Sequence, residues 1–307
     1  MKIFNFLAFI VILLLFFQNG NGQTDLSFTA NEVSFKMIFV EGGTFMMGCA
    51  SEYEGCYPEE KPQHKVNLTD FYMGEFQVTQ KLWQAIMGTN VRQQWLMREI
   101  ADRELYSHVG GGSIFDVSSK FSAEDFAKVI PLNGEGYNYP MYFINYSDCE
   151  LFCYRLNHLL SKQLPEGYRF CIPSEAQWEY AARGGKLSKG YIYSGSNTIE
   201  EVAWFENNSE KSTSQVGKKL KNELGIYDMS GNVWEWCKDW YDEQFYNYSL
   251  LSNPTGPIYG DYRVLRGGSW WSEAIVCRTS FRYKTLPHER TVKYGFRLAL
   301  VNVKNTK

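Results

Sequence analysis

The chain has 307 residues, of which 44% are hydrophobic and 17% aromatic. That much apolar side chain can build a core, which excludes intrinsic disorder as the main state. The formal net charge is −3 at neutral pH, so the chain carries no strong basic field and we expect no nucleic-acid partner.

The first 22 residues have the pattern of a secretory signal peptide. Lys2 supplies a positive charge, residues 7–17 form an unbroken apolar run, and residues 20–22 offer a small-residue cleavage site. The run is too short to anchor the chain across a bilayer. We therefore expect residues 1–22 to be a signal peptide and the mature chain to be exported, to the periplasm, the cell surface or the medium, with no membrane span after cleavage.

Because the mature chain is expected to be exported to an oxidising compartment, which permits disulfides, its seven cysteines are candidates for disulfide bonds. Cys49 and Cys56 flank a short polar loop, and we expect a local disulfide between them. Cys149 and Cys153 lie four apart on an expected helix, where side chains share a face but rarely bridge. Seven is an odd number, so at least one thiol is left over or pairs with another molecule.

Residues 23–34 are interpreted as a polar lead to a domain spanning residues 35–303. Short strands are predicted at residues 37–40, 44–48, 64–67 and 71–76. Thr79 is a good N-cap for a helix that ends at Gly88. Residues 89–139 hold charged, helix-like stretches and are predicted to be an insertion, either a lid or an ordinary surface excursion.

Two capping boxes follow the insertion. Residues 147–150 (Ser-Asp-Cys-Glu) predict a helix that runs to about Lys162, and residues 174–177 (Ser-Glu-Ala-Gln) predict a second helix that ends at the glycine pair 184–185. A short strand is expected between them at residues 168–172. From residue 190 onwards we expect short strands, turns and loops.

The stretch 225–236 gathers oxygen donors. Asp228 and Glu235 are carboxylates, Asn232 is an amide, and Gly231 allows backbone carbonyls to turn inward. Hard oxygen donors at this spacing suit Ca²⁺. The same residues also fit a turn capped by Asp and Asn, with the neighbouring tryptophans in the core, and the pattern alone leaves both interpretations open.

Two further stretches stand out, at residues 172–185 and at residues 263–270 with 295–298. In the latter pair, two adjacent glycines (267 and 268) allow a close backbone approach, and Arg266 and Arg297 are candidates to pair with buried carboxylates.

These stretches, in this order, resemble the formylglycine-generating enzyme family, also called sulfatase-modifying factors. The resemblance runs from about Met37 to Leu300 and includes the opening residues 38–48 and 76–79. It implies one irregular, loop-rich α+β domain related to C-type lectins, with little regular secondary structure.

Active members of that family oxidise a sulfatase cysteine to formylglycine with Cu(I) and O₂, and two cysteines after a Gly-Gly-Ser motif hold the copper. Here Ser272 stands at the first of these positions and Cys277 at the second. Ser269 and Trp234 match positions that line the oxygen pocket. A serine hydroxyl is a hard, protonated and poor ligand for Cu(I), so we expect copper to bind far more weakly here than between two thiolates.

The resemblance also implies a calcium site. Asp228, Gly231, Val233 and Glu235 match it, with Gly231 and Val233 donating carbonyl oxygens. We expect Ca²⁺ as a structural cofactor, and Cu(I) only if the protein is active.

The function expected from these observations is that of an exported family member that is not catalytic. It would serve as a structural or ligand- and partner-binding protein of the cell envelope, with a binding surface at Trp270 and Trp271. The alternative is an active copper-dependent oxidase that uses Cys277 and another ligand. The partner is a protein in either case, an envelope assembly component or a sulfatase-type substrate.

Overall fold

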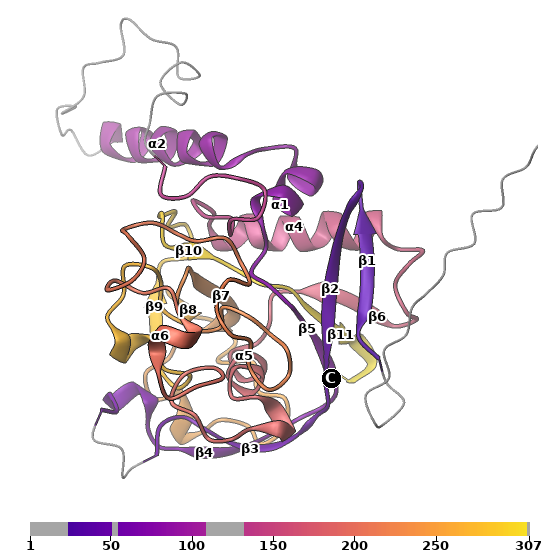
Figure 1. Cartoon of the computed structure of the whole chain (residues 1–307), viewed down its shortest axis with the longest axis vertical. Coiled ribbons are helices and arrows are strands. Elements are labelled where there is room, and N and C mark those ends of the chain that lie inside the picture. The colour runs from indigo at the N-terminus through magenta and orange to yellow at the C-terminus, as the bar shows by residue number, and fades with distance from the viewer. Residues whose placement is uncertain (1–23, 51–54, 109–131, 306–307) are drawn as a thin grey trace, which may run out of the picture.

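The computed structural model describes residues 24–50, 55–108 and 132–305 (Figure 1). The expected signal peptide at residues 1–22 and the glycine run at 110–112 lie outside these ranges. Within them, no helix is both long enough and apolar enough to cross a membrane.

The strands of the described residues form three sheets. The largest is antiparallel throughout and has the order β1 (Leu26–Ala30), β2 (Val33–Val40), β5 (Phe71–Gly74), β11 (Ala299–Asn302) and β6 (Tyr168–Cys171). The second has the order β10 (Tyr294–Gly295), β7 (Trp234–Trp240), β8 (Arg263–Arg266) and β9 (Arg282–Thr285), in which only β10 and β7 are parallel. The third pairs β3 (Gly43–Met47) with β4 (His64–Leu68).

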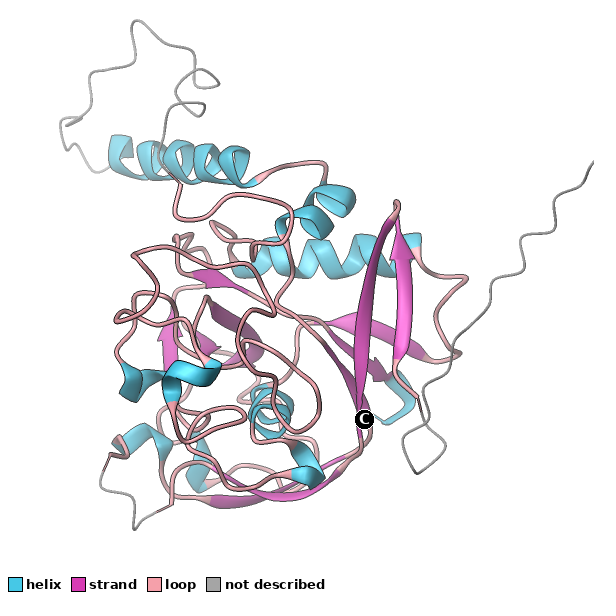
Figure 2. Ribbon diagram, in the orientation of Figure 1, coloured by secondary structure: helices cyan, strands magenta, loops and turns pink. Residues whose placement is uncertain are grey.

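Helices pack against both faces of the large sheet. They are α1 (Gln80–Met87), α2 (Val91–His108), α4 (Tyr146–Leu159), α5 (Glu175–Ala182) and α6 (Ile199–Val202). Figure 1 shows α1, α2 and α4 at one end of the molecule and the β3–β4 ribbon at the opposite end. Figure 2 shows how much of the remaining chain is loop, which confirms the expectation of an irregular α+β domain.

The predicted helix starts follow from side-chain caps. Thr79 accepts a hydrogen bond from the backbone N–H of Leu82 at 3.2 Å, and Gly88 ends α1 in the left-handed region with φ 75°. The box at the start of α5 also forms, because Ser174 accepts from the Gln177 N–H at 3.2 Å and the Gln177 side chain accepts from the Ser174 N–H at 3.0 Å. Both predictions are confirmed.

The helix predicted from Ser147 begins earlier. Its N-cap is Asn145, whose side chain accepts from the Asp148 N–H at 2.9 Å while the Asp148 carboxylate accepts from the Asn145 N–H at 3.0 Å. The predicted box at residues 147–150 was therefore wrong by two residues. Asn caps as well as Ser does, and two overlapping boxes cannot both be used.

The polar lead at residues 23–34 is also corrected. Residues 26–30 form β1, which pairs with β2 in an antiparallel hairpin. Phe28 and Ala30 are buried and alternate with exposed residues, the period-two pattern of a half-buried strand. Pairing with the apolar β2 stabilises a segment whose own composition is mainly polar.

The core between the large sheet and the helices is aromatic. Trp83 of α1 stacks on Phe152 of α4 with ring centroids 5.5 Å apart, and Phe296 meets the edge of both rings. A second cluster lies around α5 and includes Trp178, which is fully buried. The segments that carry the candidate site, one leading into β7 and one following β8, adjoin this core.

Candidate functional site

The loop that follows β8 is held compact by two glycines. Gly267 and Gly268 have φ of 95° and 76°, a region that other residues rarely adopt. A Cβ on Gly268 would lie 2.5 Å from Sγ of Cys277, closer than real side chains approach. Only glycine therefore allows the chain to pass this close to the cysteine.

Ser272, at the first position implied for copper, is engaged by its neighbour. Its Oγ accepts a hydrogen bond from the Ser269 N–H at 3.0 Å and lies 3.1 Å from the Ser269 Oγ. Both serines are buried. The structure thus brings Ser269 and Ser272 together, and a hydroxyl stands at the position where the resemblance implies a thiolate.

Cys277, at the second position, is a fully buried thiol. It packs against Ile199, Ala203 and Phe205 in a small apolar cluster. Burial, with a smaller contribution from the charge of Glu206, raises the pKa of this thiol to about 12. The group is a neutral thiol at physiological pH.

These residues do not fit Cu(I). A pair of soft sulfur ligands would be needed to hold Cu(I), and these two positions offer one sulfur, that of Cys277, and one hard hydroxyl, that of Ser272. The other free cysteines of the described residues pack in or against different hydrophobic clusters. No group of three or more His, Cys, Asp or Glu side chains in the described ranges is arranged to hold a metal ion.

Trp234, expected beside the oxygen pocket, lies on β7 and faces β9. Its ring stacks on Tyr283 at 5.2 Å and tilts against Phe281 at 6.0 Å. It belongs to the large aromatic core, whereas Cys277 belongs to the small cluster around Phe205.

Of the two tryptophans expected to form a binding surface, Trp270 is buried and only Trp271 is exposed. Trp270 is 1% exposed, and its indole N–H donates to the Val292 carbonyl at 3.1 Å, so it is a core residue. Trp271 is 55% exposed and meets the edge of Trp270 at 5.2 Å. Two adjacent residues in a loop point in different directions, so only Trp271 is available to a partner.

The four residues that the resemblance assigns to calcium converge on one point. The carbonyl oxygens of Asp228, Gly231 and Val233 and Oε1 of Glu235 all lie within 3.4 Å of a single atom. Left-handed φ angles at Asp228, Gly231 and Asn232 turn this backbone inward. Asp228 contributes its carbonyl to this point, and burial raises the pKa of its carboxyl to about 6.

The atom at the centre is Nε2 of Gln77, which the sequence analysis included in the stretch 76–79 of the family resemblance but did not assign to this site. Gln77 is 1% exposed and directly precedes the helix start at Val78-Thr79. Two signals marked this position, the family stretch 76–79 and the predicted N-cap two residues later. Neither of them reveals a partner 158 positions away.

Glu235 is already neutralised by Arg297. The guanidinium donates from Nε to Oε2 at 2.6 Å and from Nη2 to Oε1 at 2.8 Å, and the indole N–H of Trp178 donates to Oε2 at 2.6 Å. The oxygens are of the kind that Ca²⁺ prefers, but the set as it stands does not fit an ion, because an amide nitrogen fills its centre and a cation already balances its carboxylate. Calcium binding here stays a prediction.

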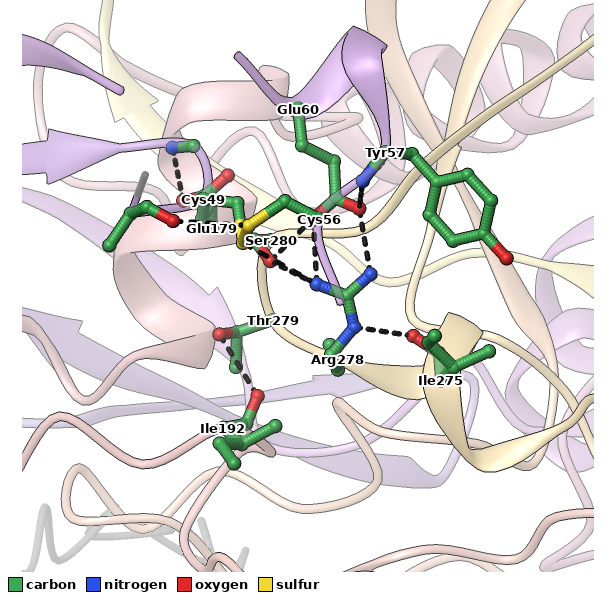
Figure 3. The surroundings of a disulfide bond; sticks show 12 residues. Cys49, Cys56, Tyr57, Glu60, Glu179, Ile192, Ile275, Arg278, Thr279 and Ser280 are labelled. Atoms are coloured by element: carbon green, nitrogen blue, oxygen red, sulfur yellow. Dashed lines mark hydrogen bonds and ion pairs between the residues drawn. A yellow bond between two sulfur atoms is a disulfide. The ribbon is translucent and has the colours of Figure 1, made fainter. Parts of the chain in front are cut away.

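The loop at residues 49–56 is closed by a disulfide and lies near the segment that follows Cys277. Cys49 and Cys56 are bonded, as the sequence predicted. Figure 3 shows Arg278 reaching from the segment after Cys277 to Glu60, just beyond the disulfide. Arg278 also donates from Nε to the Ile275 carbonyl at 2.7 Å, which closes the turn around Cys277.

Comparisons with known proteins agree with this architecture. Residues 23–301 match the model of the sulfatase-modifying factor enzyme 1-like domain. The chain belongs to the sulfatase-modifying factor family. The chaperone protein LppX of Paenibacillus barcinonensis is 31% identical over 81% of this chain and 83% of its own length. The formylglycine-generating enzyme of Streptomyces coelicolor is 28% identical over 85% of this chain and 88% of its own.

A solved structure supports the fold assignment of this sulfatase-modifying factor domain. Treponema denticola variable protein 1 superimposes with a TM-score of 0.68 and 29% identity, covering 90% of this chain and 98% of its own. The family resemblance and its irregular α+β fold are therefore confirmed. The relation to C-type lectins stays a prediction.

Proposed function

We propose that this chain is an exported, non-catalytic member of the sulfatase-modifying factor family that binds a polypeptide partner in the cell envelope. The observation that carries the proposal is the pairing of Ser272 with Ser269 where a copper thiolate would be required. Cys277 alone, kept neutral by burial, supplies one weak ligand.

The test is a turnover assay with Cu(I) and the mature chain from residue 23. The substrate is a peptide with the pattern Cys-x-Pro-x-Arg, and mass spectrometry detects the conversion of its cysteine to formylglycine. We expect no formylglycine product. A cooperative thermal unfolding transition of the same sample in the same buffer is the control that shows the protein to be folded. Formylglycine formation would overturn the proposal and establish the copper-dependent oxidase.

A polypeptide partner is supported by the relative named a chaperone protein and by the exposed ring of Trp271. Aromatic side chains are enriched in protein interfaces because they bury a large area at little entropic cost. We expect the mature chain to suppress the aggregation of thermally denatured citrate synthase, followed by light scattering.

The matched variants for that experiment are Trp271→Ser and Tyr259→Ser. Tyr259 is 84% exposed on the loop before β8 and serves as the control for loss of an exposed ring. We expect the first variant to lose suppression and the second to keep it. Equal suppression of aggregation by the two variants would show that Trp271 is not part of the binding surface. Failure of the wild type to suppress aggregation would contradict a chaperone-like role.

Export is supported by the signal-peptide pattern at residues 1–22 and by the Cys49–Cys56 disulfide, which is typical of oxidising compartments. The test is expression in a bacterial host with and without residues 1–22, followed by cell fractionation. Recovery of both forms in the same compartment would contradict it.

A further inference from the structure

Four oxygen atoms of the 228–235 loop surround the amide nitrogen of Gln77. The distances from Nε2 are 2.9 Å to Oε1 of Glu235, 3.0 Å to the Val233 carbonyl, 3.2 Å to the Asp228 carbonyl and 3.4 Å to the Gly231 carbonyl. An amide has two N–H groups, so the two short contacts are direct hydrogen bonds and the two longer ones share the same hydrogens.

The orientation of this amide is fixed by its surroundings. With the nitrogen inward, the N–H groups meet four acceptors. With the oxygen inward, Oε1 would face the same four oxygens with no donor between them, an arrangement that only a bound cation would stabilise. In the observed orientation Oε1 is buried and has no hydrogen-bond partner among the described residues. The four bonds formed by the nitrogen compensate for that orphaned acceptor.

The negative charge on the inward-facing oxygens is balanced without a metal ion. Arg297 makes two hydrogen bonds to Glu235 and two more, each of 2.9 Å, to the carbonyls of Gly74 and Tyr227. Among the four inward-facing oxygens, Oε1 of Glu235 is the one that carries charge, and the guanidinium balances it. The buried carboxyl of Asp228 is not one of these four oxygens: its Oδ2 accepts the Gly217 N–H at 2.7 Å, and its Oδ1 has no hydrogen-bond partner among the described residues. A divalent cation at the centre would find no excess negative charge on the inward-facing oxygens, and affinity for Ca²⁺ rises with that charge.

We propose that Gln77 takes the place of the cation: its amide group joins the 228–235 loop to the segment that starts α1, and the chain folds without calcium. Gln77 thereby supplies, from within the chain, the contacts that the resemblance assigned to an ion. The family relationship is retained, while the dependence on metal is lost.

The decisive measurement is the melting temperature of the wild type in EDTA and in millimolar CaCl₂, together with the calcium content of the purified protein by elemental analysis. We expect equal melting temperatures and substoichiometric calcium. A stoichiometric ion, or a melting temperature that falls on chelation and returns with calcium, would overturn the proposal. It would mean that the amide turns over and ligates the ion through Oε1.

Gln77→Glu tests the same point by gain of function. The carboxylate places a fifth oxygen at the centre, so we expect a melting temperature in EDTA at least about 5 °C below that in calcium. Gln80→Glu is the matched control, because the Gln80 amide also donates to two carbonyls, those of Gly134 and Pro140, without a surrounding oxygen cluster. The melting temperature of the Gln80→Glu variant should be the same in EDTA and in calcium. Rescue of both variants alike would contradict the assignment.

Gln77→Leu covers the case in which the glutamate variant does not fold. It removes the donor without adding charge and leaves the oxygens of the loop unsatisfied. We expect a melting temperature several degrees below that of the wild type in EDTA and in calcium alike. Wild-type stability in this variant would show that the amide does not hold the loop.

Discussion

Arg278 binds the carboxylate of Glu60 with both terminal nitrogens, from Nη2 to Oε1 at 2.7 Å and from Nη1 to Oε2 at 2.9 Å (Figure 3). The Ser280 hydroxyl donates to Oε2 at 2.7 Å, and the Cys49 N–H donates to the Glu60 carbonyl at 2.9 Å. One ion pair therefore ties the disulfide loop to the segment that carries Cys277.

Glu60→Ala should lower the free energy of unfolding by about 3–5 kcal/mol, because it removes the carboxylate that balances the buried charge of Arg278, a residue that is 1% exposed. Chemical denaturation measures the change. In a double-mutant cycle with Arg278→Met, the combined loss should be smaller than the sum of the single losses. Lys304→Ala, which removes the exposed pair with Glu166, is the control and should cost less than about 1 kcal/mol. Additive losses would show that the two side chains do not act as a pair.

Ser272→Cys should increase the affinity for Cu(I) sharply, because it places a second sulfur on the turn that already holds Ser269 and Cys277. Competition against a chromogenic Cu(I) chelator measures the affinity. The double variant Ser272→Cys with Cys277→Ser has one thiol again and should return to the wild-type value. An unchanged affinity in the single variant would mean that the pocket differs from a copper site by more than this one residue.

Asp239→Asn should change how stability depends on pH. Burial, reinforced by the charge of Glu175, raises the pKa of Asp239 to about 7, although the Glu175 N–H, Arg282 and Lys238 favour the ionised form. A raised carboxyl pKa means that folding favours the protonated group. Its contribution to stability is therefore complete near pH 4 and is lost as the pH rises towards 7.

Relative to the wild type, the Asp239→Asn protein should gain stability steadily between about pH 4 and pH 7 and hold that gain above pH 7. Thermal unfolding across this range measures the difference. Glu243→Gln changes an exposed carboxylate on the neighbouring segment and should show no such trend. A stability difference between Asp239→Asn and the wild type that does not vary with pH would contradict the buried, protonated state of Asp239.

Gly231→Ala should prevent stable folding, because its Cβ would overlap the carbonyl oxygen of Trp204 in a backbone with φ 80°. Gly88→Ala isolates the conformational cost, since Gly88 has φ 75° and open space around it. We expect that variant to lose about 1–2 kcal/mol and to fold. Circular dichroism and urea denaturation distinguish the two, and similar stabilities would show that the 228–235 loop can move away from Trp204.

The sequence predicted those features that depend on residues close to one another in the chain. The caps at Thr79 and Ser174 and the bridge between Cys49 and Cys56 depend on residues within a few positions of one another, and all three are present. The strand at residues 26–30 was missed because residues 23–34 are mainly polar in composition, and composition does not reveal the pairing with β2.

The site depends on contacts that no local pattern contains. Gln77 meets Glu235 across 158 positions, and Arg278 meets Glu60 across 218. The family resemblance located Ser272 and Cys277 but not the protonation of the thiol, which depends on the apolar side chains that surround it. Trp270 was misplaced because the direction of a loop side chain depends on its partner, here the Val292 carbonyl.

Four buried arginines near the end of the chain pair with carboxylates that precede them. Arg266 binds Glu179, Arg278 binds Glu60, Arg282 binds Glu175 and Arg297 binds Glu235. A chain that emerges from the ribosome or a translocation pore N-terminus first presents all four acids before any of these four arginines, and among the described residues only Glu179 has a nearer partner, Arg183. Until residues 266–297 arrive, burying those acids would leave charges unbalanced. The domain therefore completes its core late, and a chain interrupted before β8 cannot reach the native state.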